Sequence, residues 1–96
     1  MLIDKFVKEG ETVSLKLVSG EEIIARFEEE TSEHIKVSKP LALVQGGSSL
    51  GMIPWFFLAD SSTVKISKHA IVAGPVVSKK EAASQYIQGT TGIALS

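Results

Sequence analysis

The sequence predicts a small all-β fold of five short strands with a helix at each end. Two segments carry this prediction, residues 13–27 and residues 64–77. In both, apolar and polar residues alternate, which is the period of a strand with one face in water, and a tight turn interrupts each segment. The third observation is an uninterrupted apolar stretch, residues 52–59, which indicates a strand covered on both faces.

The chain begins with residues that predict one or two turns of amphipathic helix. Leu2, Ile3, Phe6 and Val7 have helical spacing, and Gly10 follows as a stop. One face of this short helix is therefore expected to pack on the strands.

The first predicted hairpin joins strands at residues 13–17 and 22–29. Ser19 and Gly20 form its turn, because glycine accepts the positive φ that a short hairpin turn needs. In the second strand the odd-numbered apolar residues are expected inside, and Ile24 is expected on the outer, wet face.

The third strand begins near His34 and is expected to bend or lie on an edge at Pro40, since proline cannot donate to a ladder. Residues 46–51 read as a flexible loop. The fourth strand is then expected to run from residue 52 to residue 67 as one long bent strand, with a turn or bulge at residues 60–62.

The end of the chain predicts a last strand and a helix. Lys68 and His69 form a tight corner, and a short strand begins at Ala70. Ser78 and Glu81 form a capping box, so a helix is predicted over about residues 78–88, with a weakly patterned tail at 89–96. We expect a single domain over residues 1–96, with its core at about 11–77.

Composition narrows the functional classes. The 96 residues include no cysteine, and no secretory-type leader is recognisable at the N-terminus, which together predict a cytoplasmic protein. Two histidines and no cysteine offer few candidates for a nucleophile with a base or for a metal site, so we expect no enzyme, no metal and no cofactor. Residues 1–33 carry four basic and nine acidic residues, whereas residues 34–96 carry six lysines and two acidic residues, which predicts two surfaces of opposite charge.

The apolar stretch at residues 52–59 predicts an oligomer. A chain this short has no second layer to cover both faces of that strand, so identical copies are expected to cover one another. No apolar run approaches the roughly 20 residues that cross a bilayer, so no membrane partner is expected. The expected interface residues are Met52, Ile53, Trp55, Phe56, Phe57, Ile71 and Val72.

Two short motifs resemble a known family. The segment VSLKLVSG at residues 13–20 and the segment KHAIV at residues 68–72 resemble the first strand and the last corner of the Sm-like (LSm) proteins. The local match is closest to the bacterial RNA-chaperone branch, Hfq, and the segment YIQGTTGIAL resembles the ends of Sm-like proteins of tailed phages. The resemblance implies a strongly bent five-stranded, SH3-type barrel that assembles into a homo-oligomeric ring of five to seven copies.

The resemblance also implies partners and site residues. The strand ending at Ser67 of one copy would pair with the strand starting at Ala70 of the next, and single-stranded RNA, before DNA, would lie at the central pore. The implied nucleic-acid-binding residues are Ser32, His34, Lys68 and His69. Glu33 stands in a turn where the family usually has aspartate and asparagine, and it would repel phosphate. A structural or assembly ring without nucleic acid therefore stays open as the alternative.

Overall fold

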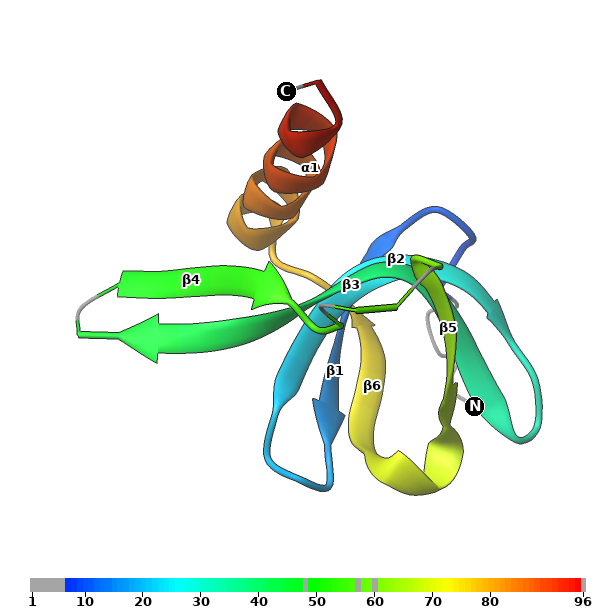
Figure 1. Cartoon of the computed structure of the whole chain (residues 1–96). Helices are drawn as coiled ribbons and strands as arrows, with labels where there is room; N and C mark the ends of the chain where they lie inside the picture. Colours follow the sequence, from blue (N-terminus) through cyan, green and yellow to red (C-terminus); the bar gives the residue numbers. More distant parts are fainter. Residues whose placement is uncertain (1–6, 48, 57, 60, 96) are drawn as a thin grey trace.

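The computed structural model describes residues 7–47, 49–56, 58–59 and 61–95, and in these residues the chain is mostly β with one C-terminal α-helix (Figure 1). All strand pairs in this part are antiparallel. The elements are β1 (Thr12–Leu17), β2 (Glu22–Glu30), β3 (His34–Gly46), β4 (Ser49–Pro54), β5 (Thr63–Ser67), the 3-10 helix η1 (Lys68–Ala70), β6 (Ile71–Val77) and α1 (Lys80–Leu95).

The N-terminal helix predicted from Leu2, Ile3 and Phe6 lies outside the described residues, apart from its last position. Val7 is described, belongs to no helix or strand, and packs against the core. Gly10 has a φ of 93°, and its N–H donates to the carbonyl of Phe27 at 2.8 Å, which fixes the entry into β1.

The long strand β3 organises the sheet. The strand order is β4-β3-β2-β1-β6, and β5 also pairs with β3. Residues 35–38 of β3 pair with β2 and with β5, whereas residues 41–42 pair with β2 and with β4. Thus β2 lies along one edge of β3, and β5 and β4 share the other edge. The two halves of β3 therefore serve different neighbours, and the sheet curls between them (Figure 1).

The bend in β3 falls at Lys39 and Pro40, where the sequence predicts an irregularity. Ile24 pairs with Leu41 and Arg26 with Ser38, so β3 has one extra residue against β2. Lys39 has a φ of 49°, a left-handed conformation that is uncommon for a residue other than glycine. The bulge turns the strand without ending it.

The prediction of one long fourth strand over residues 52–67 is wrong. β4 begins at Ser49, inside the segment for which the sequence predicts a loop, and ends at Pro54. The N–H of Trp55 then donates to the carbonyl of Pro40 at 3.1 Å, and the described residues between Pro54 and Thr63 belong to no strand. Proline at the end of β4 has no N–H for a further ladder bond, so pairing resumes only in β5. The described sheet thus has six strands rather than five.

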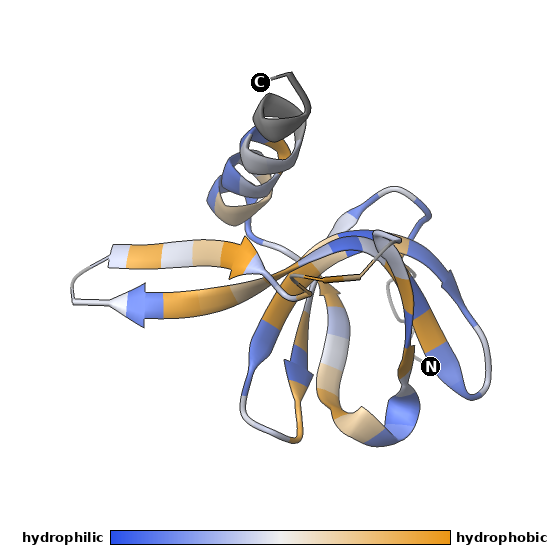
Figure 2. Ribbon diagram, in the orientation of Figure 1, coloured by the Kyte–Doolittle hydropathy of each residue, from blue (hydrophilic) through white to orange (hydrophobic). Residues whose placement is uncertain are grey.

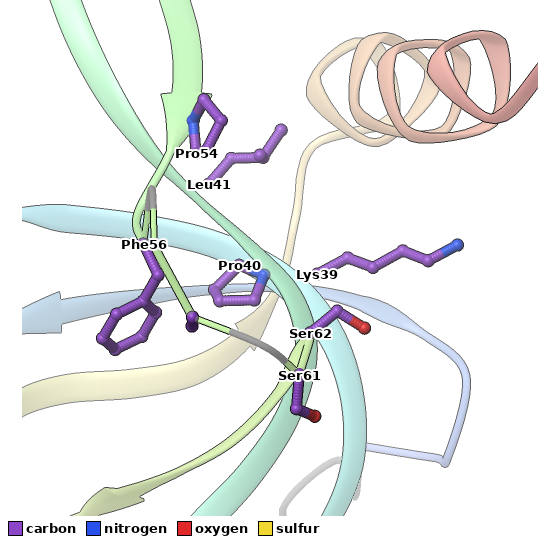
Figure 3. Close-up of a pocket in the computed structure, with 8 residues that line it drawn as sticks. Lys39, Pro40, Leu41, Pro54, Phe56, Ser61 and Ser62 are labelled. Carbon is purple, nitrogen blue, oxygen red and sulfur yellow. The ribbon is translucent and has the colours of Figure 1, made fainter. Parts of the chain in front are cut away.

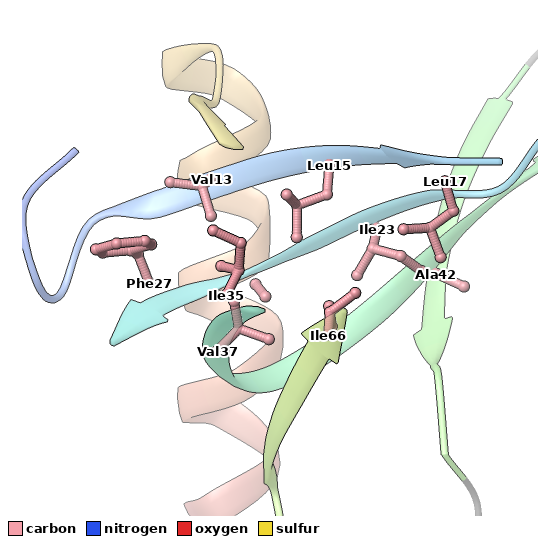
Figure 4. Close-up of a cluster of buried hydrophobic side chains, with 10 residues drawn as sticks. Val13, Leu15, Leu17, Ile23, Phe27, Ile35, Val37, Ala42 and Ile66 are labelled. Atoms are coloured by element: carbon pink, nitrogen blue, oxygen red, sulfur yellow. The ribbon is translucent and has the colours of Figure 1, made fainter. Parts of the chain in front are cut away.

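The core lies on the concave face of the sheet (Figure 4). The predicted inward residues of the first hairpin and of the start of β3 are all buried there, as is Ile66 from β5. Period-two alternation found them because every second side chain of a strand faces the same side. The cluster comprises Val13, Leu15, Leu17, Ile23, Ala25, Phe27, Ile35, Val37, Ala42 and Ile66.

The prediction that the Ile24 side chain is exposed to solvent is wrong. Ile24 pairs with Ser14 on the outer face of the sheet, yet it is fully buried. It lines a groove of about 540 Å³ on that face together with Leu43, Val76 and Ala82. The β3–β4 hairpin, the end of β6 and the start of α1 thus border the outer face at β2, and alternation alone does not reveal that cover.

α1 is longer than the predicted 78–88. It runs from Lys80 to Leu95 through Gly89, so most of the predicted tail is helical. Glycine inside a helix costs about 1 kcal/mol relative to alanine, which does not stop a helix where no proline follows. The predicted capping role of Ser78 is replaced by contacts with β1, because its hydroxyl lies 2.8 Å from that of Ser14 and its N–H donates to the carbonyl of Thr12 at 3.0 Å.

Tyr86 attaches α1 to the bend in β3. Its ring is buried, and its hydroxyl donates to the carbonyls of Lys39 at 2.8 Å and Ser38 at 3.2 Å. Burial raises the pKa of Tyr86 to about 12, because the phenolate would lose its hydration. The neutral phenol therefore holds both the helix and the bulge.

The β3–β4 hairpin projects from the rest of the sheet (Figure 1) and carries apolar side chains along much of its length (Figure 2). Val44, Leu50 and Ile53 on this hairpin are exposed. No residue from 40 to 59 is charged. The hairpin and the segment after it thus form an uncharged part of the described chain.

We predict that Gly74→Ala destabilises the protein by more than about 1 kcal/mol in urea unfolding. Gly74 has a φ of 107°, and a Cβ there would lie 2.7 Å from the carbonyl oxygen of Ser14 in β1. Gly46→Ala is the matched control, since nothing lies within 4 Å of its Cβ position, and it should change stability by less than about 0.5 kcal/mol. Equal stability of the two variants would contradict the close approach of β6 to β1.

We predict that stability falls between pH 10 and 12 because of Tyr86. The unfolded tyrosine ionises near its ordinary value of 10.0 and the folded one near 12, so the unfolded state alone releases the proton in this window. The slope is about 1.4 kcal/mol per pH unit, and Tyr86→Phe should lack this component. Since Tyr86 is the only tyrosine, absorbance at alkaline pH reads its pKa directly. Ionisation near 10 in the folded protein would refute the buried hydrogen-bonded phenol.

Candidate functional site

The turn between β2 and β3 is held by Thr31. Its hydroxyl accepts from the N–H groups of Glu33 at 3.2 Å and His34 at 3.1 Å, and its own N–H donates to the carbonyl of His34 at 2.9 Å. Threonine competes well for such local hydrogen bonds, which is why it favours turns. Ser32 is exposed at the tip of this turn.

The corner between β5 and β6 is built in a similar way. Ser67 precedes the 3-10 helix η1, and its hydroxyl accepts from the N–H of His69 at 3.1 Å. The carbonyl of Ala70 accepts from the N–H of Val18 at 2.8 Å, which ties the corner to the β1–β2 turn. His69 is exposed at the apex.

The structure brings the turn and the corner together. His34 and Ser67 are cross-strand partners, and the N–H of Lys68 donates to the carbonyl of Glu33 at 2.9 Å. All four residues that the resemblance implied as binders, Ser32, His34, Lys68 and His69, therefore lie in the turn–corner cluster at one end of the β3–β5 ladder. Residues more than thirty positions apart in the chain become neighbours here because β5 returns along β3.

The charges of the turn–corner cluster are mixed. The Lys68 ammonium lies 2.7 Å from the Glu30 carboxylate, with both side chains partly exposed. Glu29 and Glu33 are exposed nearby on β2 and in the turn. The Lys68 ammonium is therefore already paired with Glu30, and a phosphate that binds at the cluster must compete with Glu30 for this ammonium.

His34 presents an unusual polar group. Its Nε2 atom is buried and is the one buried side-chain nitrogen or oxygen of the described residues that lacks a hydrogen-bond partner. Most buried polar atoms in proteins are paired, so this nitrogen keeps an unused capacity for a hydrogen bond. In the same region, Glu30, Lys68, Ile71 and Gly74 line a pocket of about 290 Å³, to which Ile35 contributes and His34 does not.

Only part of the expected interface lies apart from the turn–corner cluster, because Ile71 and Val72 line the same pocket as Glu30 and Lys68. Met52 and Ile53 belong to β4, Ile71 and Val72 begin β6, and Phe57 lies outside the described residues. Trp55 packs against the core, so its role is partly structural. The rings of Trp55 and Phe56 lie 4.9 Å apart between centroids, a distance typical of a stacked or tilted aromatic pair.

Phe56 and Val72 are exposed, at 48% and 64%, and Leu58 is 98% exposed. The apolar stretch therefore does not fold entirely into the single chain, and sequence reasoning missed Leu58 as its most exposed member. An uninterrupted apolar stretch gives no signal of which residue faces outward.

Glu30 was also missed as a partner of the turn–corner cluster. In the sequence it belongs to a run of three glutamates that reads as a solvated face. Only the arrival of Lys68 beside the end of β2 gives it a role, and no local signal announces that contact.

The described part of the chain lacks two further classes of site. Histidines and carboxylates do not gather there in the groups of three that a metal ion would require. None of its helical segments has the length and apolar character of a bilayer-spanning helix.

Comparisons with known proteins do not assign the chain to a family. No protein-family model matches it, and no curated protein sequence matches it either. The family resemblance therefore rests on the short sequence motifs.

Proposed function

We propose that this chain is a non-catalytic subunit of an Sm-like ring that binds single-stranded nucleic acid, RNA before DNA, at the turn–corner cluster. The observation that carries the proposal is the hydrogen bond and strand pairing that join His34 and Glu33 to Ser67 and Lys68. A protein that reads unpaired bases needs flat or hydrogen-bonding groups next to a cation on one exposed edge, and this cluster offers two imidazoles and a lysine.

The strand arrangement supports the Sm-like part of the proposal. β4 and β5 pair with successive parts of the same edge of β3 and can be counted as one interrupted strand. Counted in this way, the sheet has the five strands that the Sm-like family implies. A 3-10 corner then leads into β6, which returns to pair with β1. The bulge in β3 provides the strong bend that a barrel of this size requires.

Open strand edges support the ring. Among the described residues, β4 and β5 each pair only with β3 and β6 pairs only with β1, so each of these three strands leaves one edge without a partner. Unpaired edges invite pairing with another chain. Pairing β5 of one copy with β6 of the next satisfies both edges at every interface, and such a head-to-tail contact closes into a ring.

An assembly ring without nucleic acid is the second candidate, and one observation favours it. Glu30 already pairs with the Lys68 ammonium at 2.7 Å, and Glu33 lies in the same turn. A net charge of −1 gives the chain no general attraction for polyanions. Under this alternative the turn–corner cluster stabilises the end of the barrel and binds nothing.

We predict that uridine and adenosine oligomers bind with micromolar affinity or better at low salt in a fluorescence-anisotropy titration. Lys68→Ala and His69→Ala should each weaken binding about tenfold, and added salt should weaken it further because phosphate contacts release counterions. Glu30→Gln should strengthen binding, since it frees the Lys68 ammonium. Lys65→Ala, which removes an exposed lysine of β5, is the charge control. Absence of binding to both oligomers at low salt would leave the assembly ring as the function.

We predict a mass of five to seven times the 10.3 kDa chain by light scattering at tens of micromolar. Val72→Asp, at the exposed start of β6, should release monomers because a carboxylate cannot be buried unpaired in the contact. Val18→Asp is the matched control, because Val18 is as exposed as Val72 but lies in the β1–β2 turn, outside the expected interface residues. A strict monomer for the wild-type chain would refute the ring, whatever the result with nucleic acid.

A further inference from the structure

A second cationic site lies between the outer face of the sheet and α1. A hollow of about 200 Å³ is lined there by Arg26 of β2 and Lys39 of β3, together with Thr12, Tyr86 and Thr90. We infer that this Arg26–Lys39 hollow binds a phosphate group. The inference is independent of the ring and of the turn–corner cluster, because it uses none of their residues.

Arg26 lies in the middle of a polar row across the sheet, between its cross-strand partners Thr12 and Ser38. Its only ion pair among the described residues is a long one, 3.7 Å from its Nε to the carboxylate of Glu28. That carboxylate also accepts a hydrogen bond from the hydroxyl of Ser38. The terminal N–H groups of a half-exposed guanidinium therefore stay available, and their fork matches two oxygens of a phosphate.

Lys39 is held in place by its backbone. Its N–H donates to the carbonyl of Ser62 at 2.7 Å, and its carbonyl accepts from the Tyr86 hydroxyl at 2.8 Å. These bonds maintain the left-handed φ of 49°, which glycine would adopt with less strain. A strained position that its surroundings fix is a recurrent feature of functional sites. Figure 3 shows the Lys39 side chain directed away from Phe56, and no acidic residue of the described chain pairs with its ammonium.

The charges of the hollow favour an anion. Arg26 and Lys39 supply two positive charges from different strands, and the Glu28 carboxylate, 3.7 Å from the Arg26 Nε, offsets one of them in part. Tyr86 adds no negative charge below pH 10, because burial raises its pKa. The hydroxyl of Thr12 can donate a further hydrogen bond. Two cations and a hydroxyl donor are the groups that proteins use to hold phosphate oxygens.

Two sources share this chemistry, a free phosphate compound and a phosphate of a nucleic-acid chain. The first test uses inorganic pyrophosphate and the full chain in isothermal titration calorimetry at low salt. We expect binding that is weakened about tenfold or more by Lys39→Gly and by Arg26→Gln, since each removes a charged hydrogen-bond donor. Lys39→Gly relieves the positive φ, so this variant should be at least as stable as the wild type. Lys65→Ala should bind pyrophosphate as the wild type does.

A second titration distinguishes the sources. If Lys39→Gly also weakens the binding of a uridine oligomer, the site holds a chain phosphate; if it weakens pyrophosphate alone, the site holds a free phosphate compound. Lys68→Ala should leave pyrophosphate binding unchanged, which separates this site from the turn–corner cluster. Absence of pyrophosphate binding, or equal binding by the wild type and both hollow variants, would overturn the inference.

Discussion

The bulge at Lys39 and Pro40 is the constraint on which the rest of the structure depends. Four segments meet there, because the Lys39 backbone bonds to the carbonyl of Ser62 and to the hydroxyl of Tyr86, while the Pro40 carbonyl accepts from the N–H of Trp55. A straight β3 would extend the sheet in one plane. The bend lets β5 pair with the first half of β3 and β4 with the second, so that the concave face closes over the core.

The same bend explains why the chain leaves so much apolar surface exposed. The core uses the alternating residues of β1, β2 and the first half of β3, together with Ala42 and Ile66, and a sheet of this size can cover these residues by itself. The second half of β3 and β4 extend beyond that cover as a hairpin, and Leu58 follows them into solvent. Exposed apolar groups and open strand edges are the features that a partner copy would cover, which is the physical basis of the proposed ring.

The turn–corner cluster and the Arg26–Lys39 hollow differ in their balance of charges. The turn–corner cluster combines a lysine with glutamates on the same turn and strand, so its cation is compensated within the chain. The Arg26–Lys39 hollow has the opposite balance, with two cations and a single carboxylate, that of Glu28, paired with Arg26. A protein with a net charge of −1 can still hold phosphate locally, because interactions at hydrogen-bond distance depend on the nearest charges and distant ones are screened by salt.

The sequence by itself determined the strands of the first hairpin, the corner at Lys68 and the presence of a C-terminal helix, because alternation, glycine turns and helical spacing are local signals. It also singled out four residues that the tertiary structure places together. Only the tertiary structure decided that Ile24 is buried and that Glu30 holds Lys68, since both depend on segments distant in the chain. The tertiary structure also decided where the apolar stretch is divided, at Pro54, and how long α1 is. The composition of an apolar stretch does not indicate which segments pack against each part of it, so the end of β4 at Pro54 could not be predicted. The helix continues through Gly89 because Tyr86 anchors α1 to β3, a contact that the local sequence does not indicate.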